Sequence, residues 1–265
     1  MNKLFPASLR PYQRIIEATA IPVVLLSLKE TQTELHQSKI GGLPYFPADY
    51  PVDRVYVPYP DTVSTTPWPK HSKTGKELML LLQINFEEMP RMPSFPAKGI
   101  LQLFVDDNNW HHLNEQLTAI YHPYVIRDKE LLFTDFDVPS FKVKEHAISF
   151  QKETEYRSPS DFRFDKVFEQ RELWKDYLSI TDQRFSKRDT EPGYGRNKIG
   201  GYHYSQNALD PRASMPEWKD SILLAQFQDY ASLSWGDCGS AQFFIKRKDL
   251  EHLNFNDLLF HWSST

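Results

Sequence analysis

Lys39-Ile40-Gly41-Gly42 returns later in the chain as Lys198-Ile199-Gly200-Gly201. A four-residue identity alone is weak evidence of a repeat, so the sequence that follows each copy has to agree as well. It does agree: Leu-Leu-Gln-Ile-Asn at residues 81–85 follows the first copy, and Leu-Ala-Gln-Phe-Gln at residues 224–228 follows the second. Both runs place a glutamine inside an apolar segment, which indicates that the two halves of the chain are related.

A third pair of segments follows in the same order. Residues 99–105 and 239–245 each begin with glycine and carry a glutamine three positions later, among apolar side chains. Three landmarks in one order predict an internal duplication, with quasi-repeats at about 21–145 and 146–262. No segment between them resembles a flexible linker, so we expect one globular domain over residues 1–265.

Composition and charge limit the classes of protein to consider. The 265 residues are 40% hydrophobic and carry a net charge of −4, whereas a general nucleic-acid binder normally has a basic excess. No apolar run is long enough to span a membrane, and the first residues lack the apolar core of a secretory signal. Cys238, the single cysteine, has no partner for an internal disulfide. We therefore expect a cytoplasmic protein that binds neither nucleic acid nor membrane.

Apolar runs predict more strands than helices. The expected strands share β-branched, leucine or aromatic side chains and lie at residues 23–28, 78–86, 99–105, 119–126, 141–150, 222–227, 241–245 and 256–262. Apolar residues at helical spacing predict helices at 8–19 and at 159 to about 178, with a helical turn from Lys248. Since helices do not alternate with strands, the pattern favours an α+β fold with mostly antiparallel sheets and a few helices.

Each glycine pair has two interpretations. A pair permits positive φ, so exposed amides beside Lys39 or Lys198 could hold an anion. Neither copy has the spacing of a dinucleotide-binding or P-loop motif. The alternative is a tight turn or bulge at which segments pack closely, and this structural interpretation is favoured.

Residues 43–69 combine seven prolines with aromatic side chains, among them Tyr45, Phe46 and Trp68. The prolines forbid a long helix, so this excursion is extended and broken by turns. It is either a binding surface, since loops with Tyr and Trp commonly carry function, or a lid whose rings extend the core.

Four glutamines within apolar runs, Gln83, Gln102, Gln226 and Gln242, are expected to form hydrogen-bond networks or, alternatively, to line a ligand cleft. An unpaired buried carboxamide is costly, which favours the networks.

Trp235-Gly236-Asp237-Cys238-Gly239 concentrates polar and reactive side chains between two glycines. A catalytic cysteine needs a neighbouring base, and His203 is only a distant candidate in the sequence, so a turn capped by Asp237 is favoured. No histidine spacing typical of a metal site is present, His111 and His112 included, and no cofactor is expected.

The chain resembles the YwqG-like family, a bacterial domain of unknown function numbered 1963. The resemblance is carried by Ser38 to Pro47, Leu80 to Asn85, Asn197 to Tyr202 and, most specifically, Trp235 to Ile245. It covers about residues 20–262. It implies kinship but no established activity, because the family has none to transfer.

Two hypotheses on function remain. The first is a non-catalytic module that binds another protein or a small polar ligand. Its candidate binding residues are Lys39, Gly41, Gly42, Tyr45, Phe46, Trp68, Lys198, Gly200, Gly201, Trp235 and Asp237. The second is a hydrolase or transferase with Asp237 and His203 as weak catalytic candidates beside the lysines. We favour the first hypothesis, because no motif supplies a complete set of catalytic roles.

Overall fold

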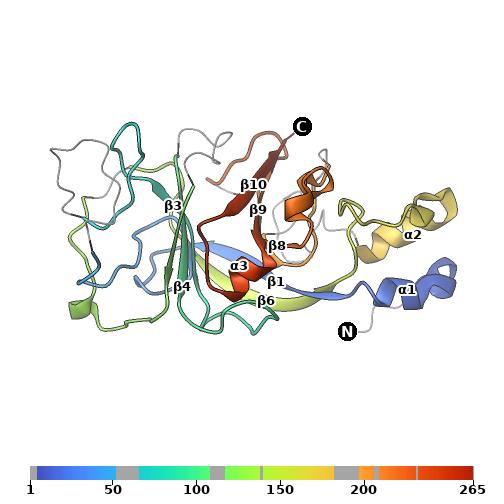
Figure 1. The fold of residues 1–265 in the computed structure, drawn as a ribbon, viewed down its shortest axis with the longest axis horizontal. Helices are drawn as coiled ribbons and strands as arrows, with labels where there is room; N and C mark the ends of the chain where they lie inside the picture. Colours follow the sequence, from blue (N-terminus) through green and yellow to red (C-terminus); the bar gives the residue numbers. More distant parts are fainter. Residues whose placement is uncertain are drawn as a thin grey trace. The chain divides into compact units, whose positions relative to one another are not determined.

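The computed structural model describes residues 5–51, 66–107, 117–137, 140–181, 197–205, 209–230 and 232–264, and the structural statements below concern these residues (Figure 1). Part of the predicted excursion, residues 52–65, lies outside them, and so do His111 and His112.

Strands dominate the structure. They are β1 (Ile21–Glu30), β2 (Lys39–Ile40), β3 (Met79–Asn85), β4 (Ile100–Val105), β5 (Thr118–His122), β6 (His146–Glu155), β7 (Lys198–Gly200), β8 (Ser221–Gln228), β9 (Ser240–Lys246) and β10 (Leu258–Ser263). The α-helices are α1 (Gln13–Glu17), α2 (Arg171–Thr181) and α3 (Arg247–Glu251). Short 3₁₀ helices lie at Ala7–Tyr12, Lys129–Leu131, Lys166–Glu169, Pro211–Ala213 and Pro216–Trp218. Every described strand register is antiparallel, which confirms a mostly antiparallel fold with few helices.

The chain divides into two compact units, each of which contains one Lys-Ile-Gly-Gly copy. Unit A comprises residues 27–150 and 248–257, and unit B comprises residues 1–26, 151–247 and 258–265. In unit A the hydrogen-bonded order is β6-β2-β3-β4-β5. In unit B it is β1-β7-β8-β9-β10.

The strand that carries each lysine pairs in the same way in both units. Lys39 lies opposite Gln83, and Lys198 lies opposite Gln226. The next strand pair continues this match, since Gln83 faces Gln102 and Gln226 faces Gln242.

A bulge falls at the same place in both units. The register shifts between Leu80 and Leu82 in β3, and between Leu223 and Ala225 in β8. An extra residue at this point bends the strand and increases its twist.

The central strands are buried on both faces, as the continuous apolar runs predict. All seven residues of β3 and all six of β4 are buried, and β8 and β9 are buried except for one residue each. Within unit B, a separate apolar cluster joins the amino-terminal helices to α2 through Leu9, Ile16, Phe168 and Tyr177 (Figure 1).

Two predicted elements lie elsewhere in the structure. The helix expected from 159 begins later, because Asp161 and Asp165 accept backbone N–H bonds from Arg163 and Val167 and hold the chain in turns. The strand expected at 141–150 is β6, five residues further on, since Phe141 packs instead against Trp68 with 5.8 Å between ring centroids.

Among the described helices, none combines the length and the apolar character that crossing a bilayer requires.

Candidate functional site

Lys39 is fully buried in unit A, and its ammonium is bound by the protein itself. Nζ donates to the carbonyl oxygens of Glu34 (2.9 Å) and Leu43 (3.1 Å) and lies 3.8 Å from Oε1 of Glu145. Burial lowers the pKa of Lys39 to about 8, and the Glu145 carboxylate opposes this shift. Lys39 therefore closes its own turn.

The glycine pair that follows Lys39 adopts positive φ, with 65° at Gly41 and 71° at Gly42. A Cβ atom on Gly42 would lie 2.5 Å from Cδ of Glu145 and 2.7 Å from its Oε1. The glycine is thus required where the backbone passes the carboxylate. The Glu145 carboxylate therefore lies against this turn, with Oε1 3.8 Å from the Lys39 ammonium.

The second copy, in unit B, holds its carboxylate more tightly. Lys198 Nζ lies 3.1 Å from Oε1 and 3.0 Å from Oε2 of Glu155, and it donates to the carbonyl oxygen of Tyr202 at 2.5 Å. The Tyr202 N–H also donates to Glu155 Oε2 (3.0 Å), and a Cβ atom on Gly201 would collide with that oxygen. Both carboxylate oxygens have partners, and the side chain of Glu155 is only 5% exposed.

Glu145 differs from Glu155 because only one of its oxygens has a partner. Oε1 accepts hydrogen bonds from the Thr33 backbone N–H (3.1 Å) and from the Thr33 hydroxyl (2.6 Å). In the described part of the chain no donor reaches Oε2, and the side chain is 23% exposed. The first copy therefore presents a partly uncommitted carboxylate oxygen to solvent.

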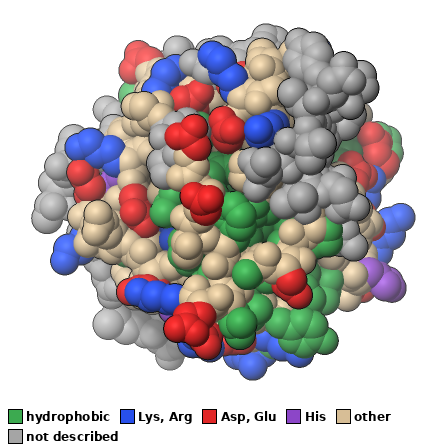
Figure 2. Space-filling view, turned by 90° about the vertical axis from the view of Figure 1, so that its left-hand side faces the viewer, with side chains coloured by type: hydrophobic (Ala, Val, Ile, Leu, Met, Phe, Trp, Pro, Cys, Tyr) green, Lys and Arg blue, Asp and Glu red, His purple; other side chains and the backbone are tan. Residues whose placement is uncertain are grey.

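Glu145 lines a pocket in unit A with a volume of about 610 Å³. The wall combines apolar and polar side chains from three segments: Gln32, Thr33, Leu35, Gly42, Leu43, Ser140, Phe141, Val143 and Glu145. Pockets for small ligands in proteins have volumes of roughly 300–1,000 Å³. Figure 2 shows one face of the molecule, on which hydrophobic side chains are exposed among acidic and basic ones.

A second hollow of about 520 Å³ shares Ser140 and Phe141 with the first. Its wall contains His71, whose Nδ1 accepts the backbone N–H bonds of Lys73 (3.0 Å) and Thr74 (3.3 Å). The proton of the neutral ring is therefore on Nε2, which lies 3.8 Å from Asp106. The backbone of the following turn thus engages the Nδ1 lone pair of His71.

The three aromatic residues predicted to form a binding surface are core residues. Tyr45 and Phe46 are fully buried, and Trp68 is 1% exposed. Trp68 Nε1 donates to the carbonyl oxygen of Leu78 (2.6 Å), and Phe46 stacks on Phe104. Their placement agrees with the interpretation that these rings extend the core.

The glutamines predicted to form networks do so fully in unit A and in part in unit B, where Gln226 Nε2 and Gln242 Oε1 have no partner among the described residues. In unit A, Gln102 Nε2 donates to Gln83 Oε1 (2.9 Å) and to the carbonyl oxygen of Tyr45 (2.8 Å). In unit B, Gln226 Oε1 accepts the backbone N–H of Tyr204 (3.0 Å), and Gln242 Nε2 donates to the Tyr204 carbonyl oxygen (3.1 Å). The glutamine pair thus fixes the chain segment that leaves each glycine turn.

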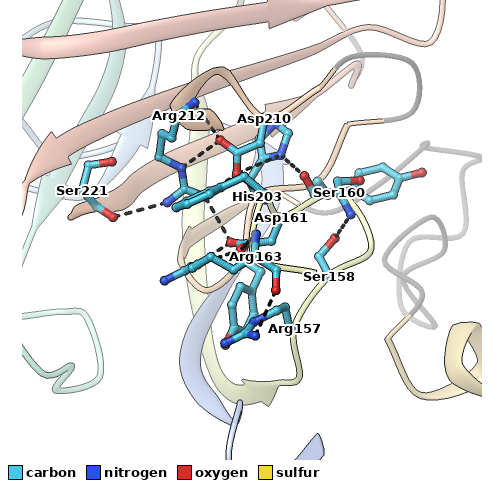
Figure 3. Close-up of polar contacts among 12 residues, drawn as sticks. Arg157, Ser158, Ser160, Asp161, Arg163, His203, Asp210, Arg212 and Ser221 are labelled. Atoms are coloured by element: carbon cyan, nitrogen blue, oxygen red, sulfur yellow. Dashed lines mark hydrogen bonds and ion pairs between the residues drawn. The ribbon is translucent and has the colours of Figure 1, made fainter. Parts of the chain in front are cut away.

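Unit B also contains a network of charged side chains in which Asp161, Asp210 and Arg212 are buried and Arg163 is exposed (Figure 3). Arg212 donates to Asp210 at 2.6 Å and to Asp161 at 3.2 Å, and Arg163 binds Asp161 through two bonds of 2.8 Å. Burial raises the pKa of Asp161, but the neighbouring Arg163 and Arg212 outweigh it and lower the pKa. The network is balanced in charge and joins the segment after β6 to the segment after β7.

His203 lies at this network with its ring fully buried. Nδ1 donates to the Ser160 carbonyl oxygen (3.3 Å) and is 4.0 Å from Asp210. Burial lowers the pKa of His203 to about 4, so the ring is neutral at pH 7. Nε2 is then an acceptor, and no residue of the described ranges donates to it.

The Trp235–Gly239 turn is organised by Asp229, which the sequence analysis did not identify. The Asp229 carboxylate accepts the backbone N–H bonds of Trp235 and Gly239. Asp237 is exposed at the surface of the turn, and Cys238 Sγ lies 3.6 Å from its Oδ1. None of the contacts described for His203 involves Asp237.

The residues that complete these sites carry no sequence signal of their own. Glu145 and Glu155 lie outside the repeated motifs, and Thr33 is 112 positions from Glu145. Only the register of the strands brings such residues together.

Comparison with known proteins identifies a family. The model of the family described as Domain of unknown function (DUF1963) matches residues 38–263. A search of curated proteins found no match.

Proposed function

The chain belongs to the family of the domain of unknown function DUF1963, and we propose that it is a non-catalytic binding module with a small-molecule site beside the first Lys-Ile-Gly-Gly turn. The observation that supports this proposal best is the pocket of about 610 Å³ bounded by Gly42 and Glu145. It combines apolar walls with a small number of polar side chains, among them the Glu145 carboxylate, which is the usual composition of a ligand site.

The contrast between the first and the second Lys-Ile-Gly-Gly turn supports the same location for the ligand site. Lys198 and Glu155 satisfy one another in a closed interior, whereas Glu145 keeps one oxygen without a described partner at a pocket wall. If Glu145 and Glu155 were both only structural, we would expect both carboxylates to be buried.

The test is a fragment titration of the whole chain, monitored by two-dimensional amide NMR. We expect shifts at Thr33, Leu43 and Glu145, and we expect Ser140→Trp to abolish them by filling the mouth of the pocket. Ser179→Trp, on the exposed face of α2, is the matched control. Shifts confined to other residues, or shifts that persist in the Ser140 variant, would contradict the proposed site.

The alternative, that the protein is an enzyme, rests on a different observation. No described residue donates a hydrogen bond to Nε2 of His203. The general base of such an enzyme would be His203 with Asp210 nearby, in place of the expected pairing with Asp237. A reactive base has to be reachable, so this alternative expects diethyl pyrocarbonate to modify His203 in the folded chain. Protection of His203 while exposed histidines react would argue against it.

We also infer that the two units are copies of one ancestral segment. Support comes from the matched lysine registers, the matched bulges and the equivalent glutamine contacts. Location in the cytoplasm, and the absence of nucleic-acid or membrane partners, rest on the net charge of −4 and the single cysteine.

A further inference from the structure

We infer that the ligand of the pocket beside Glu145 is a small organic cation, an alkyl or aryl amine; this inference rests on the proposed binding function. Three observations support this inference: Oε2 of Glu145 has no donor among the described residues, none of the described wall residues is cationic, and four of them are apolar side chains.

The first observation concerns Oε2 of Glu145, which has no donor among the described residues and can accept a hydrogen bond from a ligand. Thr33 supplies two donors to Oε1, and Lys39 is also on the Oε1 side at 3.8 Å. Oε2 is the carboxylate oxygen that no described residue reaches, and Glu145 is a wall residue of the pocket. A ligand ammonium that donates to Oε2 would form a charge-assisted bond, which is stronger than a bond from a neutral donor.

None of the described residues that line the pocket is cationic. Lys142 and Lys144 are close in sequence, but their Nζ atoms are bound to the Asp107 carbonyl oxygen (3.0 Å) and to Glu30 (3.0 Å). Lys39 is buried and donates to two carbonyl oxygens. An anionic ligand would therefore meet the Glu145 carboxylate, and none of the described wall residues would supply it with a cation.

The rest of the wall suits an apolar body. Leu35, Leu43, Phe141 and Val143 contribute hydrocarbon surface, and Phe141 offers a ring to which a cation is also attracted. The ligand class that meets all three conditions is a primary amine on an apolar chain or ring.

The experiment uses three probes of one shape: benzylamine, benzyl alcohol and benzoate. They are titrated into the whole chain at neutral pH, and binding is followed at the amides of Thr33, Leu43 and Glu145. We expect benzylamine to bind about tenfold more tightly than benzyl alcohol, since one charge-assisted bond exceeds a neutral one by about that factor. Benzoate should bind least.

Glu145→Gln keeps an acceptor for Thr33 and removes the charge, so it should bring benzylamine to the affinity of benzyl alcohol. Glu30→Gln removes a carboxylate of unit A that does not line the pocket, and it should leave the preference unchanged.

The outcomes separate the two proposals. If neither benzylamine nor benzyl alcohol shifts these amides, the pocket is not a ligand site and the proposed function fails. If both bind equally, or if benzoate binds best, the site stands and the cation inference is wrong. Retention of the tenfold preference in Glu145→Gln would also overturn the inference.

Discussion

The two Lys-Ile-Gly-Gly turns have the same backbone and different surroundings. In both, a buried lysine donates to the carbonyl oxygen four residues later, and a glycine with positive φ passes a glutamate. In unit B the glutamate is sealed with both oxygens bonded, and in unit A it opens to a pocket. The comparison teaches that a repeated motif can be structural in both copies while only one copy leaves chemistry exposed.

The carboxylates do not occupy equivalent positions. Ile40 pairs with His146 and Ile199 pairs with Val24, so the position that matches Glu145 is Val23. A Cβ atom on Gly201 would contact both Val23 and Glu155. The carboxylate that binds Lys198 is therefore not at the position of Val23 but belongs to Glu155, the last residue of β6. Each buried lysine thus has a glutamate partner, but the two glutamates come from different strand positions.

The largest expected difference between the turns concerns their glutamates. Glu155→Ala should lower the free energy of unfolding by about 3–5 kcal/mol, because it removes the buried carboxylate whose two oxygens bind the buried Lys198 ammonium. Glu145→Ala should cost about 1–2 kcal/mol, because Lys39 keeps two carbonyl acceptors and solvent reaches the site. Urea unfolding of both variants measures this, and equal losses would remove the distinction between a sealed and an open turn.

The glycines should respond alike in the two turns. Gly42→Ala and Gly201→Ala each place a Cβ at positive φ against a glutamate, and each should cost at least roughly 1–3 kcal/mol. Denaturant midpoints of the two variants give the result. A tolerated alanine in one turn only would show that the turns differ in backbone as well as in surroundings.

Acid should destabilise the protein through a buried histidine beside each turn. Burial lowers the pKa of His122 in unit A and of His203 in unit B from 6.5 to about 4. A lowered pKa means that the unfolded state binds the proton first, so stability present above about pH 6.5 is lost as pH falls towards 4. Each histidine should contribute on the order of 1 kcal/mol per pH unit within that window.

Thermal unfolding between pH 4 and 7 measures this loss in the parent chain and in two variants, His122→Asn and His203→Asn. Each variant should flatten the pH dependence, and a parent profile that is flat over this window would contradict the burial argument.

The smallest effect on stability is expected at the third pair of matched segments, residues 99–105 and 239–245. Gly99 has a φ of 88°, whereas in the other half Cys238 adopts the positive φ, at 49°. Cys238→Gly should therefore stabilise the chain by about 1 kcal/mol or less, by relieving a side chain in the left-handed region. Calorimetry would detect the change. A loss of stability would mean that the contacts of the Cys238 side chain stabilise the chain by more than its left-handed backbone conformation costs.

Much of the fold was predictable because it depends on local patterns. Continuous apolar runs identified β3, β4, β8 and β9 to within two residues at each end, since strands covered on both faces need such runs. The start of α2 was not predictable from helical spacing, because the side chains of Asp161 and Asp165 hold the preceding backbone in turns.

Less of the candidate site was predictable. Gly42 was identified, and Glu145, Thr33 and Phe141 were not, because they reach the pocket only through strand pairing and packing. His203 was identified as a polar candidate, but its neighbours Asp210 and Ser160 come from segments that the sequence does not connect to it.

Local residue types were enough to predict the two glycine turns and the buried glutamine strands, because backbone conformation and strand burial follow from them. The family follows from the match of its model to residues 38–263. The folded chain was needed to learn which lysine is paired in a closed interior and which carboxylate faces a pocket. The physical reason is that solvent exposure and hydrogen-bond completion depend on residues far apart in the chain, and two identical tetrapeptides contain no information about those neighbours.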